Sequence, residues 1–140
     1  MKKSRPLIGI IAAEAEYVFF SNALNTIQKE LFAANMDAAV FSSLMMSGNA
    51  EFDAAENSVY DLVDFDLLDG IIIFSSSIND VTSRERLIAR IKSDFKGPVV
   101  SFDSQVDGFA NCLYNYEPVA DMMVSHIMDH HGCKVIDFVG

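Results

Sequence analysis

The sequence predicts an α/β fold in which a doubly wound parallel sheet lies between two layers of helices. Four apolar runs begin at similar intervals along the chain: Pro6–Ala12, Asp37–Ser43, Gly70–Ser76 and Pro98–Ser104. Each run is continuous rather than alternating, which is typical of strands buried on both faces, and a helical pattern follows each of the first three. Such an alternation gives a three-layer αβα, Rossmann-like domain with right-handed crossovers.

Three helices are expected between these strands. The first spans Phe19–Ala34, because its apolar residues recur at a spacing of three and four, and Asn35 is a suitable residue at its end. The second helix is predicted over Phe52–Val63 by the same spacing. The third begins at Ser83, which is a good N-cap residue.

The last part of the chain is predicted to form a strand, a helix and another strand. Asn111–Tyr114 has the pattern of a short fifth strand, and a helix is expected over Pro118–His131. Gly132 is expected to end this helix, because glycine readily adopts the left-handed conformation found there. Lys134–Gly140 is then expected to form a sixth strand. Earlier in the chain, Leu44–Phe52 is expected to be a loop.

Composition and charge limit the classes of function. The chain has 140 residues, of which 51% are hydrophobic, and this suits one domain with a core of its own. Its net charge of -10 should keep it soluble and should repel nucleic acid and anionic membranes. Two cysteines, Cys112 and Cys133, are too few for a disulfide framework, which indicates a reduced, cytoplasmic protein.

The apolar run near the start has two interpretations. Leu7–Ala13 could be the hydrophobic region of a signal peptide, but it is short for that role and Glu14 follows it at once. A buried first strand is therefore favoured. No apolar stretch approaches the about 20 residues that are needed to cross a bilayer.

Polar residues follow the predicted strands, at the edge where parallel sheets bind their ligands. The hydroxyl groups of Ser43, Ser75 and Ser76 and the carboxylate of Asp103 would form a lining suited to a neutral polar ligand. Two interpretations of Asp103 are equally well supported by the sequence. It is either a ligand group or a cap for the turn that follows it.

Aromatic residues are concentrated at the turn between the first strand and the first helix. Tyr17, Phe19 and Phe20 could stack on a sugar ring, or they could pack in the core or in an interface. Tyr17 is favoured as the residue that faces a ligand, and Phe20 is included in the candidate site.

No enzyme activity, catalytic residue or cofactor is predicted. The sequence contains no glycine-rich dinucleotide or phosphate-binding motif and no GxSxG nucleophile motif. A receiver domain would need paired acids after the first strand and a phosphorylatable aspartate after the third. Ala12–Glu14 and Phe74–Ser76 supply neither.

Two groups of possible metal ligands are better explained without a metal. His126 and His130 have a helical spacing that can bind zinc, and Cys133 lies nearby. Histidines in the last turn of a helix also interact favourably with its negative end, and we favour this explanation. The acids before the third strand match no metal-loop spacing and are expected to be solvated. These acids are Asp64, Asp66 and Asp69.

Taken in order, several segments resemble the ligand-binding domain of LacI/GalR-type repressors, which has the periplasmic-binding-protein-like type I fold. "PLIGII" looks like the first strand of the family, and "FFSNALNTIQKELFAANMDAAVF" looks like its first helix and second strand. "LLDGIIIFSSS" and "GPVVSFDS" look like the next two strands, and "VSHIMDHHGCKVIDFVG" is similar to a later helix and strand. These matches extend over nearly the whole chain.

Two segments are similar to a narrower group. "NSVYDLVDFDLLDGIIIFSSSI" and "HHGCKVIDFVG" look like LacI-type sensor modules attached to GGDEF diguanylate cyclases or histidine kinases. This resemblance implies a non-enzymatic, homodimeric sensor of a small, sugar-like molecule that controls an attached output domain. Residues 1–116 would be the N-terminal lobe and residues 117–140 the beginning of a second lobe. An isolated tail of this kind is expected to associate with another copy of the chain.

The sequence also departs from the family pattern. "AAEAEYVFF" lacks the Asn-Pro that usually follows the first strand, and Asn115-Tyr116 stands where Asp-Asn is usual. Asp103 is retained. The candidate ligand-binding residues are therefore Tyr17, Phe20, Ser43, Ser75, Ser76, Asp103, Asn115 and Tyr116. Two alternatives stay open, namely a LacI-type DNA-binding repressor without its helix-turn-helix and a self-contained flavodoxin-like domain.

Overall fold

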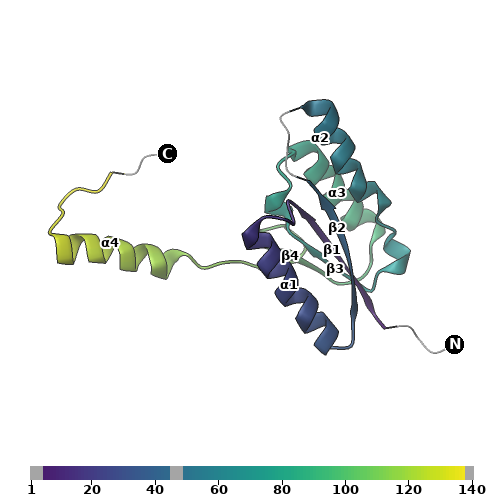
Figure 1. The fold of residues 1–140 in the computed structure, drawn as a ribbon, viewed down its shortest axis with the longest axis horizontal. Helices are drawn as coiled ribbons and strands as arrows, with labels where there is room; N and C mark the ends of the chain where they lie inside the picture. Colours follow the sequence, from purple (N-terminus) through teal and green to yellow (C-terminus); the bar gives the residue numbers. More distant parts are fainter. Residues whose placement is uncertain (1–4, 45–48, 138–140) are drawn as a thin grey trace.

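The computed structural model describes residues 5–44 and 49–137 of the chain. Five parallel strands form one sheet in the order β2-β1-β3-β4-β5 (Figure 1). The strands are β1 (Leu7–Ala13), β2 (Asp37–Ser43), β3 (Gly70–Ile73), β4 (Val99–Phe102) and β5 (Ala110–Cys112). The prediction of an α/β fold with a doubly wound parallel sheet is therefore confirmed.

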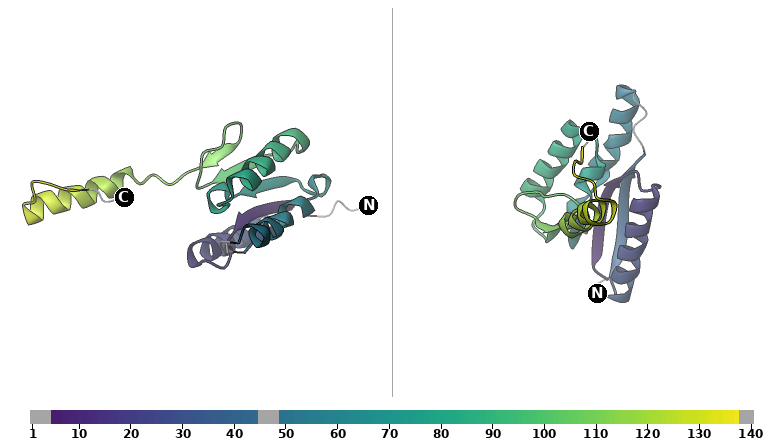
Figure 2. Two further views of the ribbon diagram at one scale, coloured as in Figure 1. Left: turned by 90° about the horizontal axis from the view of Figure 1, so that it is seen from above. Right: turned by 90° about the vertical axis from the view of Figure 1, so that its left-hand side faces the viewer.

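Helices cover both faces of the sheet, with α1 on one face and α2 and α3 on the other (Figures 1 and 2). The α-helices are α1 (Val18–Ala33), α2 (Ala50–Asn57), α3 (Val81–Asp94) and α4 (Glu117–His131). Three short 3-10 helices are η1 (Ser58–Leu62), η2 (Phe65–Leu67) and η3 (Ser75–Ser77). Helix α4 extends away from the sheet (Figure 1). Within the described residues, no helix is long and apolar enough to cross a membrane.

Strand β1, which lies between β2 and β3, separates two hydrophobic cores, because alternate side chains point to opposite faces of a strand. Ile11 lies in one core with Ile91 of α3, and Ile10 lies in the other core with Leu24 of α1. Both isoleucines are fully buried. Burying a side chain of this size stabilises the fold by about 1.5–3 kcal/mol. The continuous apolar sequence of β1 thus follows from its place between two helical layers.

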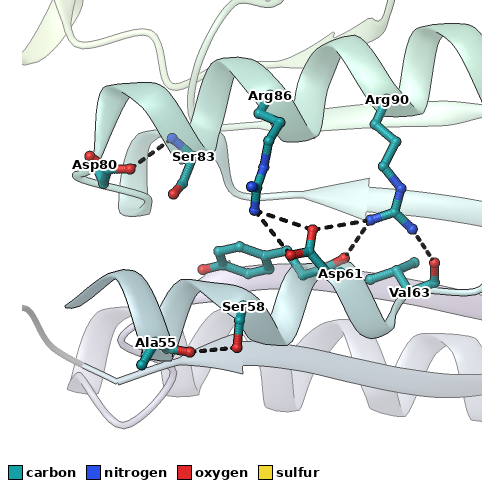
Figure 3. Close-up of polar contacts among 9 residues, drawn as sticks. Ala55, Ser58, Asp61, Val63, Asp80, Ser83, Arg86 and Arg90 are labelled. Atoms are coloured by element: carbon teal, nitrogen blue, oxygen red, sulfur yellow. Dashed lines mark hydrogen bonds and ion pairs between the residues drawn. The ribbon is translucent and has the colours of Figure 1, made fainter. Parts of the chain in front are cut away.

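Arginines of α3 tie the connection between α2 and β3 to this helix (Figure 3). The guanidinium of Arg90 donates hydrogen bonds to the carbonyl oxygens of Tyr60 and Val63, at 2.9 and 2.5 Å. It also lies over the ring of Phe65, 4.8 Å from the centroid. Arg86 instead donates to the exposed carboxylate of Asp61, at 3.1–3.2 Å.

Replacing Arg90 by methionine should lower the free energy of unfolding by about 2 kcal/mol, because two carbonyl groups lose a charged hydrogen-bond donor. Arg86→Met is the matched control on the same helix. It should lower the free energy of unfolding by about 0.5 kcal/mol or less, since an exposed ion pair contributes little to stability. Urea denaturation followed by circular dichroism compares the two variants. Equal losses of stability would show that the carbonyl contacts of Arg90 are unimportant.

Two helices have boundaries that differ from the predicted ones by more than one residue. The structure begins α3 at Val81, so the predicted N-cap Ser83 is wrong. Asp80 is the N-cap residue, and its carboxylate accepts a hydrogen bond from the Ser83 backbone N–H at 2.7 Å. Hydrogen bonds from the side chain and backbone of Ser83 lower the pKa of Asp80 below its ordinary value. An acid is favoured at this position because it also meets the positive end of the helix.

The helix predicted over Phe52–Val63 is divided. It begins earlier, at Ala50, because the side chain of Asn49 accepts hydrogen bonds from two backbone N–H groups of the first turn. The predicted loop Leu44–Phe52 is therefore wrong in its last residues, and residues 45–48 lie outside the described ranges. After Asn57 the chain tightens into η1, which buries Tyr60. Side-chain periodicity alone does not distinguish this tighter helix from an α-helix.

The prediction of a strand over Lys134–Gly140 is wrong for the residues that the structure describes. Lys134–Asp137 is described as irregular, and residues 138–140 lie outside the described part. This segment follows α4, which places it away from both edges of the sheet (Figure 1). Gly132 ends α4 in the left-handed conformation, with φ 64°, as predicted. Strands β3, β4 and β5 also end sooner than predicted, at Ile73, Phe102 and Cys112, whereas β2 has the predicted bounds.

Candidate functional site

Four connecting segments meet at the carboxyl ends of the strands, where parallel sheets bind ligands. We call this region the carboxyl edge. It consists of the segments Glu14–Tyr17, Phe74–Asn79, Asp103–Gln105 and Leu113–Tyr116, which follow β1, β3, β4 and β5. These segments contain the carboxylates of Glu14, Glu16 and Asp103 and no lysine or arginine. The carboxyl edge is therefore a polar and acidic surface.

Asp103 follows β4 and is hydrogen bonded to the segments that end the two neighbouring strands. Its backbone is left-handed, with φ 69°, a conformation that aspartate tolerates better than most residues. The Asp103 N–H donates to the carbonyl oxygen of Cys112 at 2.9 Å, which ties the ends of β4 and β5 together. Its Oδ2 accepts a hydrogen bond from the Ser76 hydroxyl at 3.2 Å. Two of the predicted site residues are thus brought together across neighbouring strands.

Two tyrosines of the segment after β5 lie beside this pair. The rings of Tyr114 and Tyr116 are 5.7 Å apart, and Tyr116 is 64% exposed. Desolvation raises the pKa of Tyr114 above its ordinary value, and the nearby charge of Asp103 adds to this increase. Asp103 therefore lies near Tyr114 at the carboxyl edge, and the Tyr116 ring lies beside that of Tyr114. Tyr114 was not among the predicted residues, although its place at the end of the fifth strand could have indicated it.

The aromatic residues near the carboxyl edge form a closed cycle of ring contacts. Adjacent ring centroids in this cycle lie 4.8–5.9 Å apart. Its members are Phe19, Phe20, Phe74, Phe102 and Tyr114. The predicted ligand residue Phe20 is thus half-buried between Phe19 and Phe74, whereas Tyr17 is 52% exposed at the start of α1.

Two predicted site serines are occupied by contacts inside the protein. Ser43 is 2% exposed, and its hydroxyl is 2.8 Å from the hydroxyl of Tyr60, which donates to the Ala12 carbonyl oxygen at 2.9 Å. Ser75 is 3% exposed and is hydrogen bonded to the hydroxyl of Ser104. A ligand at the carboxyl edge therefore meets Ser76 more directly than either of these serines.

Asn115 has a defined local role. Its Oδ1 accepts a hydrogen bond from the Glu117 N–H at 3.1 Å, in the first turn of α4. This contact orients the beginning of the helix, and it leaves Tyr116 next to Tyr114 at the carboxyl edge. Whether the candidate site residues bind a ligand stays a prediction.

A second polar feature of the carboxyl edge involves residues that sequence reasoning did not select. The Asn79 side chain donates to Glu14 Oε1 at 3.3 Å, and Glu14 has a left-handed backbone with φ 55°. Both residues line a small hollow that also receives Asp53 and Asn57 from α2. Asn79 follows the same strand as Ser76, so its place on this edge could have been read from the sequence.

The histidines of α4 are close to one another. The ring centroids of His126 and His130 are 4.8 Å apart, and those of His126 and His131 are 5.1 Å apart. All three rings are exposed. Among residues 5–44 and 49–137, no group of three or more histidines, cysteines or acids has a geometry that could hold a metal ion.

Comparison with known proteins does not assign a family. No protein-family model matches the chain, and no curated protein matches its sequence.

Proposed function

We propose that this chain is a non-enzymatic, ligand-sensing domain that binds an uncharged, hydroxylated small molecule, such as a sugar, at its carboxyl edge. The observation that carries the proposal is the group formed by Asp103, Ser76 and the tyrosine pair. The resemblance to LacI/GalR-type ligand-binding domains supports the same function. It also suggests that binding regulates an output domain of a signalling or transcriptional regulator.

The chemistry of the group fits a hydroxylated ligand. The carboxylate of Asp103 can accept hydrogen bonds from ligand hydroxyls, and the hydroxyl of Ser76 can donate or accept. The exposed ring of Tyr116 offers an apolar face with a polar end, which suits the mixed surface of a sugar. One recognition site would therefore combine charged hydrogen bonding with stacking.

The charge of the carboxyl edge favours neutral over anionic ligands. Glu14, Glu16 and Asp103 contribute negative charge, and no lysine or arginine in the four edge segments compensates it. A phosphorylated sugar or a nucleotide would be repelled by this surface. The proposal therefore separates uncharged sugars and nucleosides from their phosphorylated forms.

Saturation-transfer NMR with ribose, galactose and adenosine, and with ribose 5-phosphate as the anionic comparison, tests this proposal. Asp103→Asn should raise the dissociation constant of the bound probe by about tenfold or more, because a charged hydrogen bond becomes a neutral one. Asp94→Asn is the matched control, because Asp94 also accepts a serine hydroxyl, from Ser93 at 2.6 Å, but it lies at the end of α3.

Binding of an uncharged probe that depends on Asp103 and not on Asp94 would support the proposal. If Asp103→Asn and Asp94→Asn bound the probe equally tightly, the ligand site would lie away from Asp103. Preferential binding of ribose 5-phosphate would contradict the argument from charge.

A further inference from the structure

We propose that α4 docks on the sheet of a second copy of this chain, so that two copies exchange their α4 helices and form a dimer. The proposal is independent of the ligand. It rests on an apolar helix surface that no described residue buries, an apolar groove beside α1, and a connection that holds the two apart within one chain.

Helix α4 exposes an apolar stripe. None of its described residues is buried, and Met122 and Met123 are 67% and 59% exposed. Together with Val119 and Ile127 they recur at helical spacing, so they lie on one face, which we call the methionine stripe. A helix of 15 residues is marginally stable alone in water, and its apolar face needs a partner. Methionine side chains adapt well to such a partner surface.

The sheet has an apolar region of its own beside α1. The register pairs Phe102 with Cys112 and Val100 with Ala110, so these side chains share the α1 face of β4 and β5. Helix α1 packs on this face, and among the described residues its core contains side chains of β1, β3 and β4 and none of β5. Ala110 and Cys112 are accordingly exposed.

A hollow of about 370 Å³ marks this region. Its walls are the α1 residues Phe19, Ala23 and Ile27 on one side and Phe102 and Tyr114 on the other. We call it the open groove. Its lining includes the uncharged polar side chains of Asn22 and Thr26 and no charged side chain. The four residues of the methionine stripe are uncharged too, and His126 lies among them. The two surfaces therefore match in polarity, whereas a strongly charged partner would find no counter-charge in the groove.

The connection before α4 directs the helix away from its own groove. The Tyr114 ring lies 5.9 Å from the Phe19 ring and 5.7 Å from the Phe102 ring, and Tyr116 lies against Tyr114. The Asn115 side chain accepts a hydrogen bond from the Glu117 N–H at the start of α4. Folding α4 back onto its own sheet would disrupt these contacts. Docking on a second copy preserves them, and α4 already points outward (Figure 2).

The area of the exchange is sufficient for a stable dimer. A helix of 15 residues is about 22 Å long and about 10 Å wide, so docking half of its circumference covers about 350 Å² of helix and a similar area of sheet. Two reciprocal contacts would bury about 1,400 Å² in total, which lies within the range of about 1,200–2,000 Å² for specific interfaces. Each copy supplies one stripe and one groove, so a two-fold dimer leaves neither uncovered.

Light scattering and sedimentation of the full chain over a concentration series test the proposal. Met123→Glu, on the stripe, should raise the dimer dissociation constant by about tenfold or more. Met128→Glu is the matched control, because Met128 is on the same helix, 50% exposed and on the opposite face. It should change the constant by less than about twofold. Higher salt should tighten the dimer, since each copy carries a net charge of -10.

A disulfide between two copies of the chain distinguishes exchange of α4 helices from folding of α4 back onto its own sheet. Met122→Cys combined with Cys133→Ser should form a disulfide with the native Cys112 of the other copy, which gives a covalent dimer on non-reducing electrophoresis. Met128→Cys combined with Cys133→Ser should form none. A monomer at all concentrations, equal effects of the two glutamate variants, absence of the Met122→Cys disulfide or a disulfide within one chain would each overturn the proposal.

Discussion

Phe74→Ala is expected to lower the free energy of unfolding by about 4 kcal/mol, because it removes a large side chain from the centre of the fold. Phe74 is fully buried. Its ring meets Phe102 at 4.8 Å and Phe20 at 5.9 Å, so it joins the end of β3 to α1 and β4. The alanine variant would leave a cavity where these elements meet. Denaturation in urea, followed by circular dichroism, measures the loss.

The matched control for this prediction is Phe32→Ala. Phe32 is 72% exposed on α1 and contacts the guanidinium of Arg5. Its removal should cost about 1 kcal/mol or less, since exposed cation–π contacts are weak. If Phe74→Ala lowered the free energy of unfolding as little as Phe32→Ala, the Phe74 ring would not stabilise the junction of β3, β4 and α1.

Tyr60→Phe is expected to lower the free energy of unfolding by about 2–3 kcal/mol, although it removes a single oxygen atom. The Tyr60 hydroxyl donates to the Ala12 carbonyl oxygen and accepts from Ser43, and all three groups are buried. Phenylalanine would leave two buried polar groups without this partner. Thermal and urea denaturation of Tyr60→Phe, Ser43→Ala and the double variant measure the effect. The two single losses should not add, because they share one hydrogen bond.

The pH dependence gives an independent check of Tyr60. Burial raises the pKa of Tyr60 above 10.0, more than the hydrogen bonds with Ser43 lower it. The folded state then retains the proton more strongly than the unfolded state, so the contribution to stability is complete below pH 10.0 and is lost as the pH rises through the raised pKa. Tyr60→Phe should lose less stability over this alkaline range. Parallel pH profiles for the two proteins would contradict the assignment.

The sequence predicted the layered fold because its strongest signals are local. The unbroken apolar run of β1 and the helical spacing of Leu24 and Ile27 each reflect burial on a known face. The cap at Asp80 and the shortened α2 were missed, because several residues could begin each helix and the alternatives differ by single hydrogen bonds.

The candidate site was only partly accessible to sequence reasoning. Ser76 and Asp103 follow predicted strands, so their meeting at one edge could be expected. The role of Tyr60 could not, because its hydroxyl reaches Ser43 and Ala12 across the fold. The contact between Phe19 and Tyr114 likewise joins distant parts of the chain, and no local pattern encodes it.

Amide NMR spectra of the ¹⁵N-labelled chain, recorded during titration with an uncharged sugar such as ribose or galactose, test the central claim most directly. We expect saturable shifts that concentrate at Ser76, Asp103, Tyr114 and Tyr116 and that disappear in Asp103→Asn. The amides of the α3 end, near Asp94, should stay unchanged. Shifts that are absent for every uncharged probe, or that concentrate away from the carboxyl edge, would contradict the proposed ligand site.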